Sequence, residues 1–123
     1  MTRIIIPVSD RNGLDAHLAE HFGRASFYEE VTLGSDGKIE KVSTVENKGE
    51  HFGGHGHMHE HLLELRPDVI ITHGMGPRGL CGFQDAGISV MKANADTVKE
   101  VVNAYKENRL EKLIEGCHNA HHH

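Results

Sequence analysis

The chain has 123 residues, a formal net charge of −5 at pH 7 and an aromatic content of 5%. This length suits one domain with its own hydrophobic core, and an acidic chain without a basic stripe is a poor match for nucleic acid. Two cysteines, Cys81 and Cys117, are too few and too far apart for a secreted disulfide framework. Because no run approaches the roughly 20 apolar residues of a membrane span and no signal-peptide pattern is visible, we expect a cytoplasmic protein.

The first half of the chain predicts three strands. Residues 3–8 (RIIIPV) form an apolar run that is typical of a buried strand, and a polar turn follows it. Residues 27–33 and 39–46 are β-prone segments on either side of Gly-Ser-Asp-Gly at 34–37, a turn pattern that favours a β-hairpin. These segments predict the antiparallel part of a sheet.

The second half alternates predicted helices and strands. Residues 58–65 carry apolar side chains at helical spacing, and Pro67 ends that helix. We expect a short buried strand at 68–72, a helix over 77–86 with proline in its first turn, and a strand at 88–91.

A long amphipathic helix is predicted next, capped at its N-terminus by Asn94 or Asp96. Its apolar face is expected to carry Val98, Val101, Val102, Tyr105 and Leu110. This order of elements indicates an α/β fold, with a mixed sheet of about five strands and flanking helices. We expect one domain over residues 1–115 and a flexible Cys/His tail over 116–123, which could be a second chelating arm or an expression-tag remnant.

Histidine is the compositional anomaly, with 12 residues in the chain. Five of them crowd one glycine-rich segment: His51, His55, His57, His59 and His61. The last four can chelate a metal in either local conformation, because they form i,i+4 pairs in a helix and alternate onto one side of an extended loop. Neutral imidazole suits Zn, Cu, Ni or Fe. The alternative is a solvated loop that binds metal only adventitiously.

A second group of candidates follows the strand predicted at 68–72, in HGMGPRGLCG. Ligands of open α/β sheets tend to sit at the carboxyl ends of strands, where Gly74, Gly76 and Gly79 would let backbone N–H groups converge on an anion. Arg78 adds a full positive charge, and the helix N-terminus adds a partial one. The alternative is a tight strand-to-helix turn without a ligand.

Two residues of metal-binding type flank this glycine turn. His73 precedes it, and Cys81 follows it within the predicted helix. Together they place an imidazole and a thiolate beside the expected anion-binding turn. Cys81 could instead be a small buried hydrophobe.

Catalysis is poorly supported by the sequence. A two-metal hydrolase site could be imagined from four carboxylates: Asp10, Asp15, Asp68 and Asp85. However, Asp10 and Asp15 lie in a predicted turn and Asp68 lies just before a predicted strand, and carboxylates in turns are usually solvated caps. A nucleophile at Cys81 would need a base and an orienting group, and only histidines in predicted loops are near it. We therefore expect no enzymatic activity.

Two stretches carry a family resemblance. PVSDRNGLDAHLAE with HFGRASFYEEV, and later VIITHGMGPRGLCGFQDAGISVM, resemble the motifs of the dinitrogenase iron-molybdenum cofactor biosynthesis domain family. The positions that match these motifs include His21, Phe22, Gly23, Arg24, Gly74, Gly76 and Gly79. The resemblance implies a ribonuclease H-like fold without its nuclease carboxylates, in small proteins that bind, carry or help to assemble molybdenum-containing or iron-sulfur clusters. His21 could instead be structural, packing over the Gly23 turn.

The sequence therefore predicts a non-enzymatic binder of an anionic metal-sulfur cluster, like the iron-molybdenum cofactor, in cofactor biosynthesis or delivery. The expected cofactor contacts are His21, Arg24, Gly74, Gly76, Arg78 and Gly79. The expected metal ligands are His51, His55, His57, His59, His61, His73 and Cys81. Cluster-assembly or acceptor proteins are the expected partners, with neither nucleic acid nor membrane. The alternatives are a simple Zn, Ni or Cu site in the histidine-rich loop and a metal-dependent interaction module.

Overall fold

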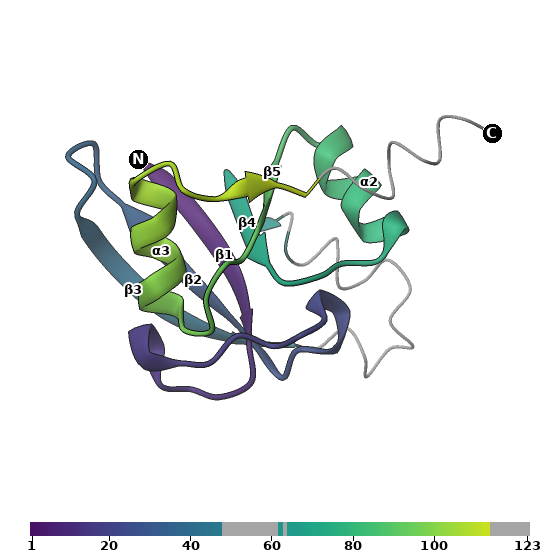
Figure 1. The fold of residues 1–123 in the computed structure, drawn as a ribbon, viewed down its shortest axis with the longest axis horizontal. Coiled ribbons are helices and arrows are strands. Elements are labelled where there is room, and N and C mark those ends of the chain that lie inside the picture. The colour runs from purple at the N-terminus through teal and green to yellow at the C-terminus, as the bar shows by residue number, and fades with distance from the viewer. Residues whose placement is uncertain (48–61, 63, 114–123) are drawn as a thin grey trace.

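The computed structural model describes residues 1–47, 62 and 64–113 (Figure 1). In chain order, its elements are β1 (Thr2–Val8), the 3-10 turns η1 (Gly13–Asp15) and η2 (Phe22–Arg24), β2 (Phe27–Leu33), β3 (Ile39–Glu46), β4 (Val69–Thr72), α2 (Pro77–Asp85), β5 (Ser89–Lys92), α3 (Val98–Lys106) and β6 (Glu111–Lys112). Within these described ranges, no helix is long and apolar enough to cross a membrane.

The strands form one mixed sheet of six strands in the order β3-β2-β1-β4-β5-β6. Neighbours β1, β4 and β5 are parallel to one another, whereas β2, β3 and β6 run antiparallel to their neighbours. The carboxyl ends of β1, β4 and β5 therefore meet at one edge of the sheet. The predicted mixed α/β architecture is confirmed. The sequence indicated about five strands, and β6 is an additional one.

α2 and α3 pack on opposite faces of this sheet and belong to two separate buried clusters. Successive side chains of each strand point alternately into one cluster and the other. Ile4 and Ile6 of β1 join Val98, Val101 and Val102 of α3 in one buried cluster. On the other face, a second cluster combines Ile5, Tyr28, Ile70 and Val90 of the strands with Phe22, Leu62, Leu80 and Phe83. Figure 1 shows α3 in front of β1 and β2, with α2 to the right of β4 and β5.

The hairpin was predicted correctly, and β2 and β3 have the expected bounds. Gly37 lies in its turn with φ +81°, a conformation that L side chains rarely adopt. After α2, Gly87 has φ +84°, the left-handed conformation in which a glycine commonly ends a helix.

The last helix differs from its prediction at both ends. Its N-cap is Thr97, whose side chain accepts a hydrogen bond from the Glu100 N–H, so the predicted caps Asn94 and Asp96 are wrong. The helix ends at Lys106, and Asn108 has φ +58°. Leu110 is therefore not on the helix; it is buried in the turn that leads into β6.

Part of the predicted helix over 58–65 lies outside the described residues. Leu62, which the structure describes, is fully buried in the second cluster, and its carbonyl accepts a hydrogen bond from the Leu65 N–H at 3.1 Å. The tail predicted over 116–123, with Cys117, lies outside the described residues too.

One buried carboxyl is unusual in this core. Glu29 of β2 is 1% exposed; its Oε1 accepts a hydrogen bond from Thr44 at 2.8 Å, and its Oε2 has no hydrogen-bond partner among the described residues. Burial raises the pKa of Glu29; the Thr44 hydrogen bond opposes this shift, and the charge of Asp10 adds to it. Because the folded state holds the proton more tightly than the unfolded chain, stability should fall as pH rises above the ordinary glutamate value of about 4.3.

We therefore expect Glu29→Gln to stabilise the protein at pH 8 by on the order of 1 kcal/mol, because the amide keeps the Thr44 contact and removes a buried charge. The gain should shrink as the pH falls below about 4.3, because the wild-type carboxyl then becomes neutral in the unfolded chain as well as in the folded protein. Urea unfolding at several pH values measures it. Glu30→Gln, on the opposite face of the same strand, is the control, and an equal effect of both substitutions at every pH would contradict this assignment.

Candidate functional site

Residues 17–22 lead from η1 into η2 and cross the carboxyl ends of the parallel strands (Figure 1). We call them the crossing segment. Backbone hydrogen bonds hold it there, among them Ala19 N–H to Pro7 O at 2.9 Å, Leu18 N–H to Asp96 O at 2.8 Å, and Phe22 N–H to Gly74 O at 3.0 Å. The loops that follow β1, β4 and β5 are thus joined into one surface, which we call the crossing edge.

At one end of the crossing segment, the HFGRA motif forms η2. Phe22 is 1% exposed, with its ring centroid 5.0 Å from that of Tyr28 and 5.5 Å from that of Phe83. The Tyr28 hydroxyl also donates to the Phe22 carbonyl at 2.7 Å. His21 and Arg24 are exposed on either side, and the His21 side chain makes no capping hydrogen bond. Phe22 anchors the turn in the core, so the exposed side chains of His21 and Arg24 are available to bind a ligand.

The glycine turn after β4 is fixed by a buried hydroxyl. Thr72 is 0% exposed, and its Oγ1 donates to Gly74 O at 3.0 Å and accepts from Gly74 N–H at 3.3 Å. Gly76 caps α2, and a Cβ built on it would meet no atom within 4 Å, so the backbone is open to approach from outside. The first-turn N–H groups of Arg78 and Gly79 have no carbonyl partner within the helix.

The two candidate ligands beside this turn have different surroundings. His73 Nε2 lies 3.4 Å from Asp96 Oδ1, and the His73 side chain is 31% exposed. Cys81 is half-buried on α2 and packs against the second hydrophobic cluster. Arg78, one turn earlier, is exposed. The structure therefore brings His73, Arg78 and the glycine amides to the crossing edge and sets Cys81 against the core.

The histidine-rich candidates His51, His55, His57, His59 and His61 lie outside the described residues. Asn47, the last described residue before that segment, is fixed to the HFGRA turn. Its N–H donates to Ser26 O at 3.2 Å, and its Nδ2 donates to Ala25 O at 2.7 Å and to Gly23 O at 3.4 Å. The described chain before this segment therefore ends beside the HFGRA turn.

The crossing edge also contains a pair that sequence reasoning missed. His17 Nδ1 lies 3.2 Å from Asp10 Oδ2, and Asp10 also accepts from the backbone N–H groups of Asn12 and His17. Partial burial raises the pKa of Asp10, but these hydrogen bonds outweigh it and hold the pKa below its ordinary value. No spacing rule links a turn aspartate to a histidine seven residues later, so only the fold brings them together.

The carboxylates weighed for hydrolysis are dispersed. Asp68 Oδ2 accepts the Arg3 N–H at 2.9 Å at the amino end of β1, far along the sheet from Asp10. Among the described residues, no three His, Cys, Asp or Glu side chains lie close enough together to hold a metal ion. The crossing edge therefore offers dispersed cations, imidazoles and amides, without a compact ion site.

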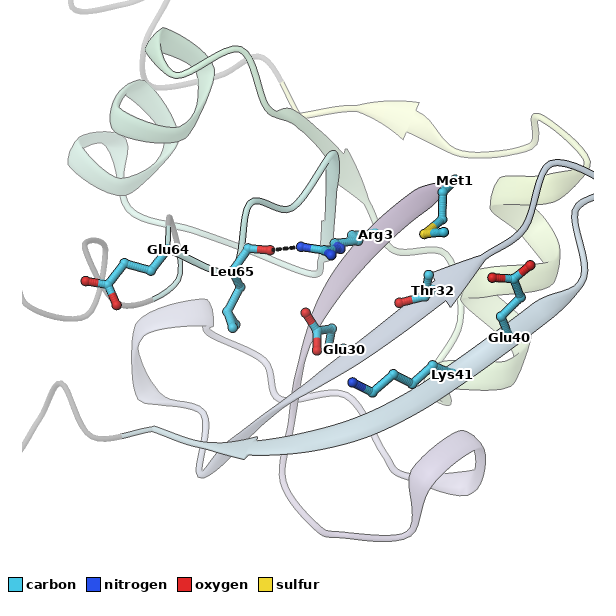
Figure 2. Close-up of a pocket in the computed structure, with 8 residues that line it drawn as sticks. All are labelled: Met1, Arg3, Glu30, Thr32, Glu40, Lys41, Glu64 and Leu65. Atoms are coloured by element: carbon cyan, nitrogen blue, oxygen red, sulfur yellow. Dashed lines mark hydrogen bonds between the residues drawn. The ribbon is translucent and has the colours of Figure 1, made fainter.

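A cavity of about 470 Å³ lies at the other end of β1. Figure 2 shows its charged lining, in which Arg3 donates to the Leu65 carbonyl while Glu30 and Lys41 rise from the hairpin. None of the predicted site residues lines it. The predicted residues gather at the open crossing edge instead.

Comparison with known sequences decides the family. The sequence model of the family described as dinitrogenase iron-molybdenum cofactor matches residues 2–108. The chain belongs to the dinitrogenase iron-molybdenum cofactor family. The resemblance noted from the two motifs is thereby confirmed, and the matched range contains every described residue of the crossing edge that we have named.

Relatives of this family member support the same architecture. The uncharacterized protein MJ0580 of Methanocaldococcus jannaschii is 27% identical over 115 residues, which are 92% of each chain. The apo form of the orange protein from Desulfovibrio gigas has a TM-score of 0.77 at 23% identity, covering 92% of this chain and 93% of that one. A NifB-like protein from Thermotoga has a TM-score of 0.72 at 23% identity, covering 92% and 94%. These solved structures share the fold with this family member.

Proposed function

We propose that this family member binds and carries an anionic metal-sulfur cluster, of the iron-molybdenum cofactor class, during cofactor biosynthesis or delivery. The cluster is cargo and is not chemically converted. The observation that supports the proposal is the hydrogen bond from the Phe22 N–H to Gly74 O, which joins two turns. One carries the exposed His21 and Arg24, and the other carries the exposed Arg78, the half-buried His73 and the open Gly76 backbone. Cluster-assembly or acceptor proteins would be the partners that load and unload it.

The donor set fits a cluster better than a single ion. A bound Zn²⁺ needs about four ligands converging on one point, and the described residues offer no such group. A cluster is larger and spreads its negative charge over several sulfides, so separate contacts along an edge can hold it. Guanidinium groups and helix N-terminal amides are suited to this, because both present N–H donors to anions.

Each element of the edge then has a distinct role. Arg24 and Arg78 would balance the charge of the cargo, and His21 and His73 would ligate exposed metals. The backbone N–H groups of Gly76, Arg78 and Gly79 would donate hydrogen bonds to its sulfides. Cys81 remains a proposed thiolate ligand, which would require its side chain to leave its contacts with the second cluster.

The strand order also supports the finer fold assignment. An antiparallel β3-β2-β1 unit continued by parallel β4 and β5 is the arrangement expected from the resemblance to a ribonuclease H-like fold. In open sheets of this kind, ligands bind outside the carboxyl ends of the parallel strands, which is where the crossing edge lies.

Anaerobic reconstitution with iron, sulfide and molybdate tests the proposal. We expect cluster absorption bands, and iron, sulfide and molybdenum retained through gel filtration, in a chain truncated after Gly116 to remove the terminal histidines. A second variant with alanine at His55, His57, His59 and His61 separates the two kinds of metal binding. If this variant loses all metal, or if the truncated protein holds only loosely bound zinc, the protein is a simple histidine-loop metal binder and the proposal fails.

A further inference from the structure

The proposed function gives no role to His17, although backbone contacts fix its position. Its backbone forms a β-bridge with Thr97, and its carbonyl accepts the Ser9 N–H at 2.9 Å. These contacts tie it to the end of β1 and to the start of α3. Its side chain is 65% exposed, whereas the next residue, Leu18, is buried. His17 is therefore held rigidly by its backbone while its ring faces solvent.

The same contacts bring His17 beside the proposed cargo surface. Asp96 and Thr97 form the turn between β5 and α3, and His73 Nε2 contacts the Asp96 carboxylate at 3.4 Å. His17 bridges to Thr97, and the Leu18 N–H bonds to the Asp96 carbonyl. Two imidazoles from different loops thus flank one turn.

The Asp10 carboxylate fixes the orientation of the His17 ring. Its Oδ2 lies 3.2 Å from His17 Nδ1, so the neutral ring can donate from Nδ1 and keep its Nε2 lone pair away from Asp10. A carboxylate partner on one ring nitrogen is the usual companion of a metal-ligating histidine, because it selects the tautomer and the ring angle. His73 and Asp96 repeat the arrangement with the opposite nitrogen.

We propose that His17 is an additional cargo-binding residue of the crossing edge, with Asp10 as its positioning residue. The inference rests on the proposed function, and it extends the cargo surface from the HFGRA turn along the whole crossing segment. A cluster seated on this surface would contact His21 at one end of the segment and His17 at the other. Atoms of the cargo are not altered by this contact; His17 Nε2 supplies an electron pair to an exposed metal.

The test compares His17→Gln and Asp10→Asn with Lys106→Gln, an exposed substitution on α3. Each protein, truncated after Gly116, is reconstituted anaerobically with iron, sulfide and molybdate, and retained metal is titrated. We expect roughly tenfold weaker retention for His17→Gln and for Asp10→Asn, the range seen when metal ligands lose carboxylate partners. Lys106→Gln should retain cargo as the wild type does.

A second readout separates ligation from structural support. In long-range ¹H-¹⁵N spectra of the wild type, the Nε2 signal of His17 should shift or broaden on loading, which a merely structural histidine would not show. Unchanged Nε2 signals, or wild-type retention by His17→Gln, would overturn this inference alone. If the wild type retains no cluster, the proposed function and this inference both fail.

Discussion

Phe22→Ala is expected to destabilise the fold by about 3–5 kcal/mol, the usual cost of removing a fully buried aromatic ring. The ring fills the space between Tyr28 and Phe83 in the second cluster, and its removal leaves a cavity there. The hydrogen bond from the Tyr28 hydroxyl to the Phe22 carbonyl would also lose its support. Urea denaturation followed by circular dichroism measures the loss.

The neighbouring residue is a matched control for that substitution. His21 is exposed and makes no capping hydrogen bond, so His21→Ala should change the free energy of unfolding by less than about 0.5 kcal/mol. If the Phe22→Ala protein is too unstable to measure at 25 °C, Phe22→Leu should give a smaller loss of unfolding free energy in the same direction. A Phe22→Ala protein as stable as wild type would mean that the HFGRA turn is not anchored by this ring.

The second large effect is expected for cargo binding. Arg24→Glu combined with Arg78→Glu should weaken retention of the reconstituted cluster by at least about 100-fold, which corresponds to about 2.7 kcal/mol. Both guanidinium groups are exposed at the crossing edge, and the exchange replaces attraction by repulsion towards an anionic cargo. Stability should change little, because neither side chain is buried.

Lys99→Glu combined with Lys106→Glu is the matched control, since it alters the formal charge equally from exposed positions on α3. Raising the salt concentration should weaken wild-type retention and narrow the difference between the two double variants. If both pairs weaken binding to the same extent, the effect is one of net charge, and the crossing edge is not the cargo surface.

Local pattern was enough to predict β1 to β5 and the hairpin. The apolar run of β1 marks a buried strand, and the β-prone segments on either side of the Gly34–Gly37 turn mark the two strands of a hairpin. β6 could not be predicted, because Glu111 and Lys112 are exposed and show no pattern of their own. They pair with β5 only because the chain turns at Asn108, so tertiary pairing decides the strand.

Competition among adjacent polar residues explains the error in the helix cap. Asn94, Asp96 and Thr97 can all cap a helix, and the sequence does not rank them. In the structure, the Asp96 carbonyl is bonded to Leu18 and its carboxylate contacts His73, which leaves Thr97 at the position from which a side chain reaches Glu100. Asp96 therefore contacts the crossing edge, and Thr97 caps the helix in its place.

The candidate site was predictable where a motif lies within one turn of chain. The glycine turn and the HFGRA turn have this property, and their exposed residues meet at the crossing edge because Phe22 bonds to Gly74. His17 and Asp10 belong to no such motif. Their pairing depends on how the loop after β1 folds back on itself, and periodicity contains no information about that.

The crossing edge is assembled by backbone hydrogen bonds, which the N–H groups of Ala19, Leu18 and Phe22 donate to the carbonyls of Pro7, Asp96 and Gly74. Such bonds do not depend on which side chains face outwards. A designer could therefore exchange the exposed imidazoles and guanidinium groups for other ligands without dismantling the platform beneath them. The same separation of scaffold from chemistry would let natural sequences of this fold change the groups presented on this surface by point substitutions, while the buried residues stay as they are.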